Sequence, residues 1–340
     1  MDAEYCRLVP RQQYSAPLNS SLDRNIGSRR KRQHMKIGII GAGALGGYYG
    51  AKLARAGETV HFIARGATLQ ALRTRGLTVV RDDETFTISD VRATGDAKEV
   101  GPVELVLVTT KSYDLEGAAQ ALRALKGPDT IVVPLQNGVD SAARLGALTE
   151  PTHILGGLTY LPASVSKPGV VRQSGTEKPL LLGPLCAADE DAAETALFVL
   201  RRAGIAAERP ADIRVAMWMK FMGAIATMGV QSVTGRGIGP TREDPDTRAL
   251  YMGCMREVEA VAGKSGVVLP DGAPDRLMSA IDSYPTDAKA SMLQDLEQGK
   301  PLELEAMHGT VVRLGDALGV PTPVNRFIYA ALKLRAGAQR

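Results

Sequence analysis

The chain has 340 residues, of which 44% are hydrophobic and 23% are charged, and its formal net charge is +4. This length favours two domains with sizeable cores. The whole net charge lies in residues 1–34, and the remainder carries 34 basic and 34 acidic side chains. A neutral body argues against a nucleic-acid partner, while three distant cysteines and four scattered histidines favour neither a disulfide framework nor a metal site.

Residues 1–34 are polar and end in the basic run Arg29–Arg32. Such a segment buries too little apolar surface to fold alone, so we predict a disordered tail. A basic arm that binds nucleic acid, or an extension upstream of a natural start at Met35, are the alternatives. We see no signal-peptide core before Met35 and no apolar run near the roughly 18 residues of a membrane span. We therefore expect a cytoplasmic protein without a membrane partner.

The stretch 35–57 predicts a strand, a tight glycine turn and a helix that stops at Gly57. The turn comprises Gly41, Ala42, Gly43, Ala44, Leu45 and Gly46. In a dinucleotide-binding turn the first glycine allows the bend, the second leaves room for a pyrophosphate, and the third permits close packing of helix on strand. The phosphates would bind the N–H groups at the start of the helix. A glycine-rich turn without a ligand is the alternative.

A second strand is predicted at 59–64, and Arg65 follows it. NAD-selective proteins place an acidic residue about 20 positions after the glycines, where it binds the ribose 2′-hydroxyl. A guanidinium instead suits a 2′-phosphate in charge and geometry. The sequence therefore predicts NADPH over NADH, and an arginine that merely ends a strand in solvent is the alternative.

The next elements place two further polar residues near the glycine turn. We predict a short helix at 67–75, a hairpin or meander at 77–92, strands at 103–110 and 130–135, and a helix at 115–125 between these strands. Lys111 and Asn137 follow the two buried strands. Because ligands bind beyond the carboxyl ends of parallel strands, both residues are candidates for the cofactor site. A surface lysine and a plain turn are the competing interpretations.

The chain changes character near Asp212. Before it, short strands within 152–184 are expected to extend the sheet, and a helix at 192–202 closes the first domain. After it, only helical periods follow, at 213–233, 246–265, 273–283, 287–298, 303–318 and 323–335. We predict an α/β dinucleotide-binding domain at 35–211 and an all-helical domain at 212–335.

A lysine stands in the apolar segment of the first of these helices. Lys220 lies among Trp218, Met219 and Phe221, so it either reaches the surface along its methylene stem or has a chemical role. Burial lowers the pKa of a lysine, which suits a proton donor near neutral pH. Ser291 and Glu303, further on, are by themselves ordinary helix residues.

Six blocks in order together resemble the ketopantoate reductase family (2-dehydropantoate 2-reductase) from Met35 to about Arg335. They are GAGALGG, Arg65, VTTK ending at Lys111, QNG around Asn137, WMK around Lys220, and SMLQD with Glu303 eight residues beyond it. The resemblance implies a Rossmann-type domain, a helical second domain, NADPH, and reduction of 2-dehydropantoate to (R)-pantoate in pantothenate biosynthesis.

The resemblance also assigns residues. It implies that the cofactor is bound by the turn from Gly41 to Gly46 and by Arg65, Lys111, Asn137, Ala163 and Glu303. It makes Lys220 the proton donor, Ser291 a substrate contact and Asn137 a neighbour of the substrate. We add the hypothesis that Glu303 orients Lys220.

Two positions depart from the family pattern. Family members usually carry asparagines four and eight residues after the lysine, which hold the substrate, whereas this chain has Ala224 and Met228. The substrate pocket is therefore expected to be less polar, and the identity of the acid stays open. Thr227 and Gln231 are candidate substitutes for the missing amides. Asp114 also stands where an amide is common.

Three other functions stay open at this point. The nearest is an NADPH-dependent reductase of the same build that acts on a different 2-keto or 3-keto acid. The second is a non-catalytic NADPH-binding protein, against which Lys220 and Glu303 argue. The third is nucleic-acid binding by the basic tail. A homodimer formed through the helical domain is also open.

Overall fold

The computed structural model describes residues 34–151 and 153–337. These residues form two compact units. The sheet unit contains the described residues up to Gln136 together with Ser141–Ile213, and the helical unit contains Asn137–Asp140 and the chain from Arg214 onward. The predicted disordered tail, its basic run included, lies outside the described residues except for His34.

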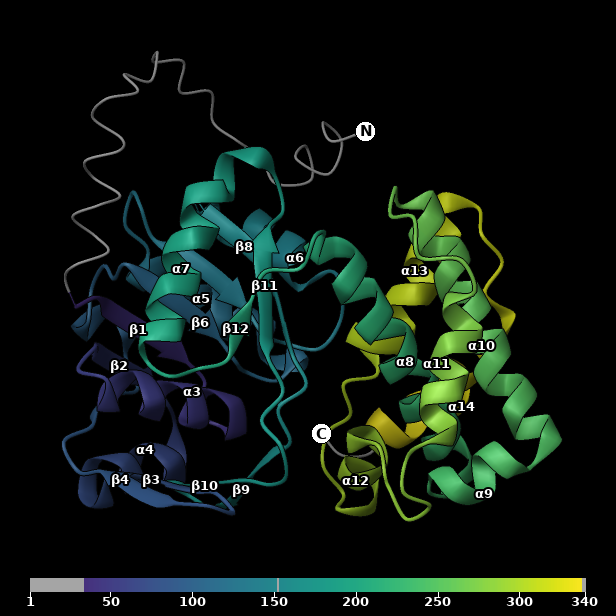
Figure 1. The fold of residues 1–340 in the computed structure, drawn as a ribbon, viewed down its shortest axis with the longest axis horizontal. Helices are drawn as coiled ribbons and strands as arrows, with labels where there is room; N and C mark the ends of the chain where they lie inside the picture. The colour runs from purple at the N-terminus through teal and green to yellow at the C-terminus, as the bar shows by residue number, and fades with distance from the viewer. Residues whose placement is uncertain (1–33, 152, 338–340) are drawn as a thin grey trace. The chain divides into compact units, whose positions relative to one another are not determined.

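The larger sheet of the sheet unit has eight strands and lies at its centre (Figure 1). Their spatial order is β12 (Ala207–Glu208), β11 (Leu180–Pro184), β8 (His153–Thr159), β7 (Ile131–Pro134), β6 (Leu105–Val108), β1 (Lys36–Ile40), β2 (Thr59–Ile63) and β5 (Arg92–Thr94). All neighbouring pairs are parallel except β8 and β11. The strand β6 is LVLV and fully buried, as expected for a strand covered on both faces.

Helices cover both faces of this sheet. They are α3 (Ala44–Arg55), α4 (Gly66–Arg75), α5 (Leu115–Leu125), α6 (Ser141–Thr149) and α7 (Glu190–Arg202). A Cβ at Gly38 would meet Leu125 of α5, whereas the next residue, Ile39, lies against Gly50 of α3. Because successive strand residues point to opposite faces, α3 and α5 lie on opposite sides. The chain goes from β1 to β2 on one side and to β6 on the other, which creates a switch point where ligands bind in such sheets.

A second sheet of four strands was not predicted. Its order is β4 (Thr85–Ile88), β3 (Leu77–Val80), β10 (Val170–Gln173) and β9 (Ala163–Lys167). The hairpin of β3 and β4 confirms the expectation for 77–92. The expectation that all strands of 152–184 extend the first sheet was wrong for β9 and β10. Gly47 of α3 leaves room for Val171 of β10, and α3 packs between the two sheets (Figure 1).

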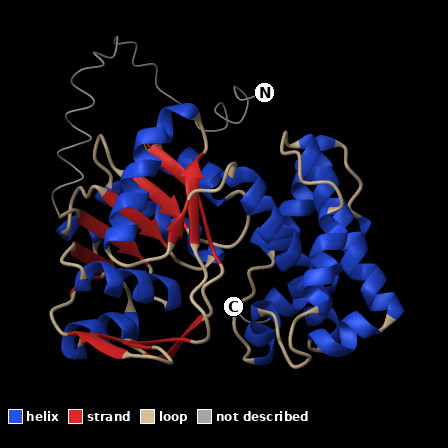
Figure 2. Cartoon of the chain, in the orientation of Figure 1, coloured by secondary structure: helices blue, strands red, loops and turns tan. Residues whose placement is uncertain are grey.

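The described residues of the helical unit form helices and no strands (Figure 2). They are α8 (Ile213–Thr234), α9 (Ile238–Glu243), α10 (Pro245–Lys264), α11 (Ala273–Asp282), α12 (Ser291–Glu297), α13 (Thr310–Leu318) and α14 (Pro323–Gly337), with a π-helical turn at Glu305–Gly309. Three details differ from prediction. The helix α9 occupies a predicted glycine-rich loop, α12 starts four residues late, and the helix expected at 303–318 begins as the π-helical turn at 305 and is α-helical only from 310.

Helix α8 runs through the core of the helical unit. Met222, Ile225, Ala226 and Val230 on it are completely buried. Among the described residues it is the one helix long and apolar enough to cross a membrane by length and composition, although 56% of the relevant window is buried inside the structure. Core helices pass the same test, so we interpret α8 as a core helix that carries Lys220.

Candidate functional site

The glycine turn has the geometry that its sequence predicts. Gly41 has φ 95°, and a Cβ there would lie 2.9 Å from the backbone nitrogen of Thr110. A Cβ at Gly46 would overlap the Gly41 carbonyl and the Thr109 hydroxyl. At Gly43, by contrast, a Cβ would have no heavy atom within 4 Å. The turn is therefore crowded where it packs on the sheet and open at the start of α3.

Hydrogen bonds from neighbouring strands fix this turn. The Thr109 hydroxyl donates to the carbonyls of Ile40 at 3.1 Å and Gly41 at 2.6 Å, and the Gly41 amide donates to the Ile63 carbonyl at 3.0 Å. Gly43 precedes α3 without a side-chain cap. The first N–H groups of α3 have no acceptor within the helix, so they can bind an anion.

A pocket of about 170 Å³ opens beside the turn, at the carboxyl ends of β1, β2 and β6. It is lined by Ile40, Gly41, Ala42, Gly43, Ile63, Ala64, Arg65, Thr68, Thr110, Asp114, Gly117, Ala118 and Ala121. The Arg65 guanidinium is 68% exposed and lies 3.7 Å from the Asp114 carboxylate. The pocket thus offers one cation to a ligand phosphate and also one anion that competes for it.

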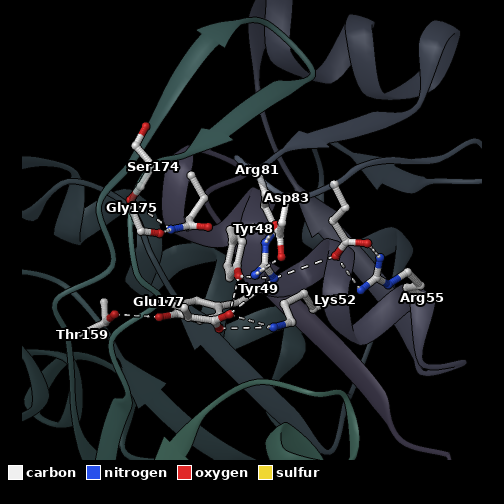
Figure 3. A network of polar contacts seen from close by, with 12 residues as sticks. Tyr48, Tyr49, Lys52, Arg55, Arg81, Asp83, Thr159, Ser174, Gly175 and Glu177 are labelled. Carbon is white, nitrogen blue, oxygen red and sulfur yellow. Dashed lines mark hydrogen bonds and ion pairs between the residues drawn. The ribbon is translucent and has the colours of Figure 1, made fainter.

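A network of buried and partly buried polar groups holds α3 in place (Figure 3). The Glu177 carboxylate accepts from the Tyr48 hydroxyl at 2.8 Å and from Lys52 Nζ at 3.1 Å, and it lies 3.5 Å from Arg81. Lys52 is only 4% exposed. Burial raises the pKa of Tyr48, so its hydroxyl stays protonated and donates to Glu177. This network anchors the helix whose first turn faces the pocket.

Five predicted cofactor residues of the sheet unit lie outside the pocket lining: Ala44, Leu45 and Gly46, which begin α3, and Lys111 and Ala163. Lys111 is exposed and precedes the 3₁₀ turn Ser112–Asp114 after β6. Ala163 is the first residue of β9 and packs against the core of the sheet unit. Near Lys111, the Gln136 side chain donates to the Thr110 hydroxyl at 3.0 Å. The roles of Lys111 and Ala163 stay predictions.

In the helical unit one amide joins two charged groups. Lys220 Nζ donates to Asn137 Oδ1 at 3.3 Å, and Asn137 Nδ2 donates to Glu303 Oε2 at 3.2 Å. Glu303 is only 5% exposed. Three residues that the sequence separates widely therefore form one cluster, which we call the lysine cluster.

The loop Asn137–Asp140 is fixed to the helical unit. Gly138 has φ 108°, and a Cβ there would lie 3.1 Å from the Ala306 carbonyl. The Asp140 carboxylate accepts from the Thr310 hydroxyl at 3.2 Å and from Arg313 at 3.5 Å. These contacts dock the loop on the π-helical turn and α13. Sequence reasoning missed Asp140, although it follows the QNG block by two residues.

Burial changes the chemistry of Lys220. It lowers the pKa of the ammonium from 10.5 to about 8, and the negative charge of Glu303 opposes this fall. A lysine with this pKa is mostly protonated at pH 7 and gives up its proton more readily than an exposed one. The lysine cluster can thus supply a proton to a developing oxyanion.

Ser291 lies on α12, a helix that carries no residue of the lysine cluster. It is the exposed first residue of α12. The start of this helix is fixed by Gln231 of α8, whose Oε1 accepts from the Ala290 amide at 2.8 Å. The structure therefore places Ser291 on a well-defined helix end, and its contact with a substrate stays a prediction.

Sequence reasoning also missed a buried polar group within the π-helical turn. His308 in this turn is 0% exposed, and its Nδ1 lies 2.9 Å from Asn325 Oδ1. Burial lowers the pKa of His308 to about 4, so the ring is neutral at pH 7. The four histidines are scattered in the sequence, so no pattern there indicated that His308 is buried against Asn325.

These features define a class before any comparison with relatives. A dinucleotide-type turn at the switch point of a parallel sheet, in a chain that also buries a lysine with a near-neutral pKa, is the arrangement of a nicotinamide-dependent oxidoreductase. The chain matches the family described as "Ketopantoate reductase PanE/ApbA" over residues 37–186 and its C-terminal counterpart over residues 212–336. It belongs to the ketopantoate reductase family, which confirms the resemblance seen in the sequence.

Individual proteins similar to this chain carry the same family name or share its fold. The 2-dehydropantoate 2-reductase of Mesorhizobium japonicum is 33% identical, with 88% of this chain and 97% of that protein covered. The crystal structure of a ketopantoate reductase from Ralstonia eutropha has a TM-score of 0.82 at 33% identity, with 90% of this chain and 99% of that chain covered. A D-mandelate dehydrogenase, solved with NADH and anilino(oxo)acetate, shares the fold with a TM-score of 0.81 at 23% identity, with coverage of 90% and 99%.

Proposed function

We propose that this enzyme reduces a 2-keto acid to the 2-hydroxy acid with NADPH, and that 2-dehydropantoate, which gives (R)-pantoate in pantothenate biosynthesis, is the first substrate to test. The observation that carries the proposal is the lysine cluster, a buried cation with a lowered pKa bridged by an amide to a buried carboxylate. The names of the relatives indicate the substrate. We also propose that the reaction takes place in the cytoplasm.

Two features of the sheet unit support NADPH as the proposed cofactor. The open space at Gly43 and the start of α3 suit the pyrophosphate, and the exposed guanidinium of Arg65 suits the 2′-phosphate. When bound, NADPH supplies the hydride that reduces the carbonyl carbon. The proposed preference for NADPH over NADH rests on Arg65. The neighbouring Asp114 carboxylate competes with the 2′-phosphate for Arg65 and so reduces this preference.

Lys220 completes the reduction with a proton. The ammonium polarises the ketone oxygen and protonates it as negative charge develops there. Asn137 holds the donor by accepting a hydrogen bond from its Nζ, and Glu303 keeps it charged. The keto acid gains a hydride at carbon and a proton at oxygen, and Lys220 regains its proton from solvent.

Replacement of Lys220 by alanine tests the proposal. We expect kcat with NADPH and 2-dehydropantoate to fall by about 10²-fold or more, the scale of a lost general acid, while the Kd for NADPH stays within threefold. Lys264→Ala, at the exposed end of α10, is the control and keeps normal turnover. Near-normal turnover of Lys220→Ala contradicts the assignment, and NADPH binding by the wild type without turnover of any keto acid indicates a non-catalytic binding protein.

A further inference from the structure

The amide that joins Lys220 to Glu303 is carried by a loop. Asn137 lies in the loop 137–140, between β7 and α6. A side chain on a loop is placed less precisely than one on a helix or strand. The Asn137 amide nevertheless meets both charged groups, at 3.3 Å and 3.2 Å. The loop therefore needs support from its surroundings, and the three residues after Asn137 supply it.

Gly138 and Val139 lie against the helical unit. A Cβ at Gly138 would be 3.1 Å from the Ala306 carbonyl, so the loop backbone passes close to the π-helical turn. Val139 is 4% exposed and belongs to the buried core of the helical unit. Apolar burial is not directional, so these contacts hold the loop near the helices without fixing the orientation of the Asn137 side chain.

Asp140 supplies a directional contact. Its Oδ2 accepts from the Thr310 hydroxyl at 3.2 Å and from Arg313 Nη2 at 3.5 Å. Thr310 is 1% exposed and begins α13. Arg313 Nη2 donates to the Thr310 hydroxyl oxygen at 2.9 Å. The Thr310 proton can then point to Asp140 or to the Glu305 carbonyl at 3.3 Å, and the charged carboxylate is the stronger acceptor.

One oxygen of Asp140 makes this contact. The other, Oδ1, is buried and has no hydrogen-bond partner among the described residues. An amide at position 140 could therefore replace the carboxylate, because its single side-chain oxygen suffices for Thr310. This distinguishes an anchoring role of Asp140 from a role of its negative charge.

We propose that Asp140 is a positioning residue, which binds the start of α13 and thereby holds the Asn137 amide within the lysine cluster. The inference rests on the proposed function and deepens it. Three residues of chain span at most about 10 Å, so an anchor at Asp140 limits the movement of Asn137. Without this anchor, Lys220 loses the acceptor that holds its ammonium in place, and proton transfer slows.

Asp140→Ala tests the proposal. We expect kcat, with NADPH and the keto acid that the wild type reduces, to fall about tenfold, since a small displacement of a catalytic group costs this much or more. Asp140→Asn removes the charge but keeps the oxygen for Thr310, so its kcat should stay within threefold of the wild type. Asp271→Ala, at an exposed position before α11, is the matched control and keeps normal kcat.

A double variant separates positioning from a general structural role. If Asp140 acts through Asn137, its loss costs nothing more once Asn137 is alanine. We therefore expect kcat of Asn137→Ala/Asp140→Ala to lie within threefold of kcat of Asn137→Ala. A merely structural role of Asp140 would instead multiply the two losses. Circular dichroism checks that each variant folds.

Three results would overturn the proposal. The first is a kcat of Asp140→Ala within threefold of the wild type. The second is an equal loss in Asp140→Asn, which would assign the effect to the charge. The third is a further loss of more than threefold in the Asn137→Ala background. If Asp140→Ala does not fold, Thr310→Val, which removes the hydroxyl but keeps the shape, replaces it in the first and third comparisons.

The pKa of Lys220 gives a readout that is independent of turnover. It is followed by ¹³C NMR of protein labelled at lysine Cε, and Lys220→Ala identifies the signal. Because an acceptor favours the charged lysine, this pKa should fall by about one pH unit in Asp140→Ala and stay at about 8 in Asp140→Asn. An unchanged pKa in folded Asp140→Ala overturns the inference but not the proposed function, whereas the absence of turnover with any keto acid overturns the proposed function alone.

Discussion

The charge of Glu303 is expected to set the pH range in which the enzyme works. Asn137 lies between Glu303 and Lys220, within 3.2 Å of one and 3.3 Å of the other. Burial lowers the pKa of Lys220 to about 8, and the negative charge of Glu303 opposes this fall. Glu303→Gln keeps the shape and a hydrogen-bonding oxygen but removes the charge. The pKa of Lys220 should therefore fall in this variant.

The size of the effect follows from the geometry. The hydrogen bonds of 3.3 Å and 3.2 Å and the amide between them keep the Lys220 nitrogen and the Glu303 carboxylate within about 9 Å of each other. At an effective dielectric constant of about 20, unit charges at this limit attract by about 2 kcal/mol. This energy corresponds to more than one pH unit. Since a proton donor must be protonated to act, kcat/KM falls as pH rises through its pKa. In Glu303→Gln, the alkaline limb of the plot of kcat/KM against pH should move from near pH 8 to pH 7 or below.

The assay is kcat/KM for NADPH-dependent reduction of whichever keto acid is turned over, measured from about pH 6 to about pH 10. Glu303→Asp keeps the charge and should leave the limb near pH 8. Glu305→Gln is the matched control, because Glu305 is 61% exposed and pairs with Arg313 instead. A limb that stays near pH 8 in Glu303→Gln, or moves to higher pH, refutes this account of Lys220.

Three further predictions concern other parts of the chain. Glu177→Gln leaves Lys52 buried without its counter-charge, so urea unfolding should show a loss of about 2 kcal/mol; a loss below about 0.5 kcal/mol contradicts the buried ion pair. Asp114→Asn removes the carboxylate 3.7 Å from Arg65 and should lower the KM for NADPH about threefold while leaving the KM for NADH unchanged. If both KM values change equally, Arg65 does not bind the 2′-phosphate. His308 has a pKa of about 4 when folded and about 6.5 when unfolded, so the unfolded state takes up the proton first and stability falls as pH drops from 6.5 to 4, by about 3 kcal/mol. In His308→Gln this fall should be smaller by that amount, and identical pH profiles contradict the assignment.

The regular elements were predictable from local patterns. The helix α5 has the predicted bounds, Leu115–Leu125, because apolar residues recur at helical spacing and the flanking strands read as buried runs. The glycine turn was predictable because Gly41 and Gly46 each satisfy a backbone constraint that other residues cannot meet.

Features that depend on distant contacts were not predictable. The strand β10 pairs with β3, about 90 residues earlier, because Val171 fits against Gly47. The π-helical turn at Glu305–Gly309 forms the first turn of a segment that reads as one continuous α-helix. No local sequence pattern encodes this strand pairing or this π-helical turn.

The candidate site shows the same division. The sequence could place Lys220 on an apolar helix and Asn137 after a buried strand, and the family resemblance indicated Glu303. It could not show that the three side chains meet, since Asn137 is 83 residues from Lys220 and 166 from Glu303. It also gave no sign that the loop of Asn137 belongs to the helical unit.

The central claim is that hydride passes from NADPH to the ketone carbon of a 2-keto acid. The most direct test incubates the enzyme with 2-dehydropantoate, or with another 2-keto acid that it turns over, and NADPH that carries deuterium at both C4 positions of the nicotinamide. The product is examined by mass spectrometry and NMR. We predict one deuterium at C2 of the hydroxy acid for each NADP⁺ formed. NADPH binding without any deuterated hydroxy acid would contradict the account.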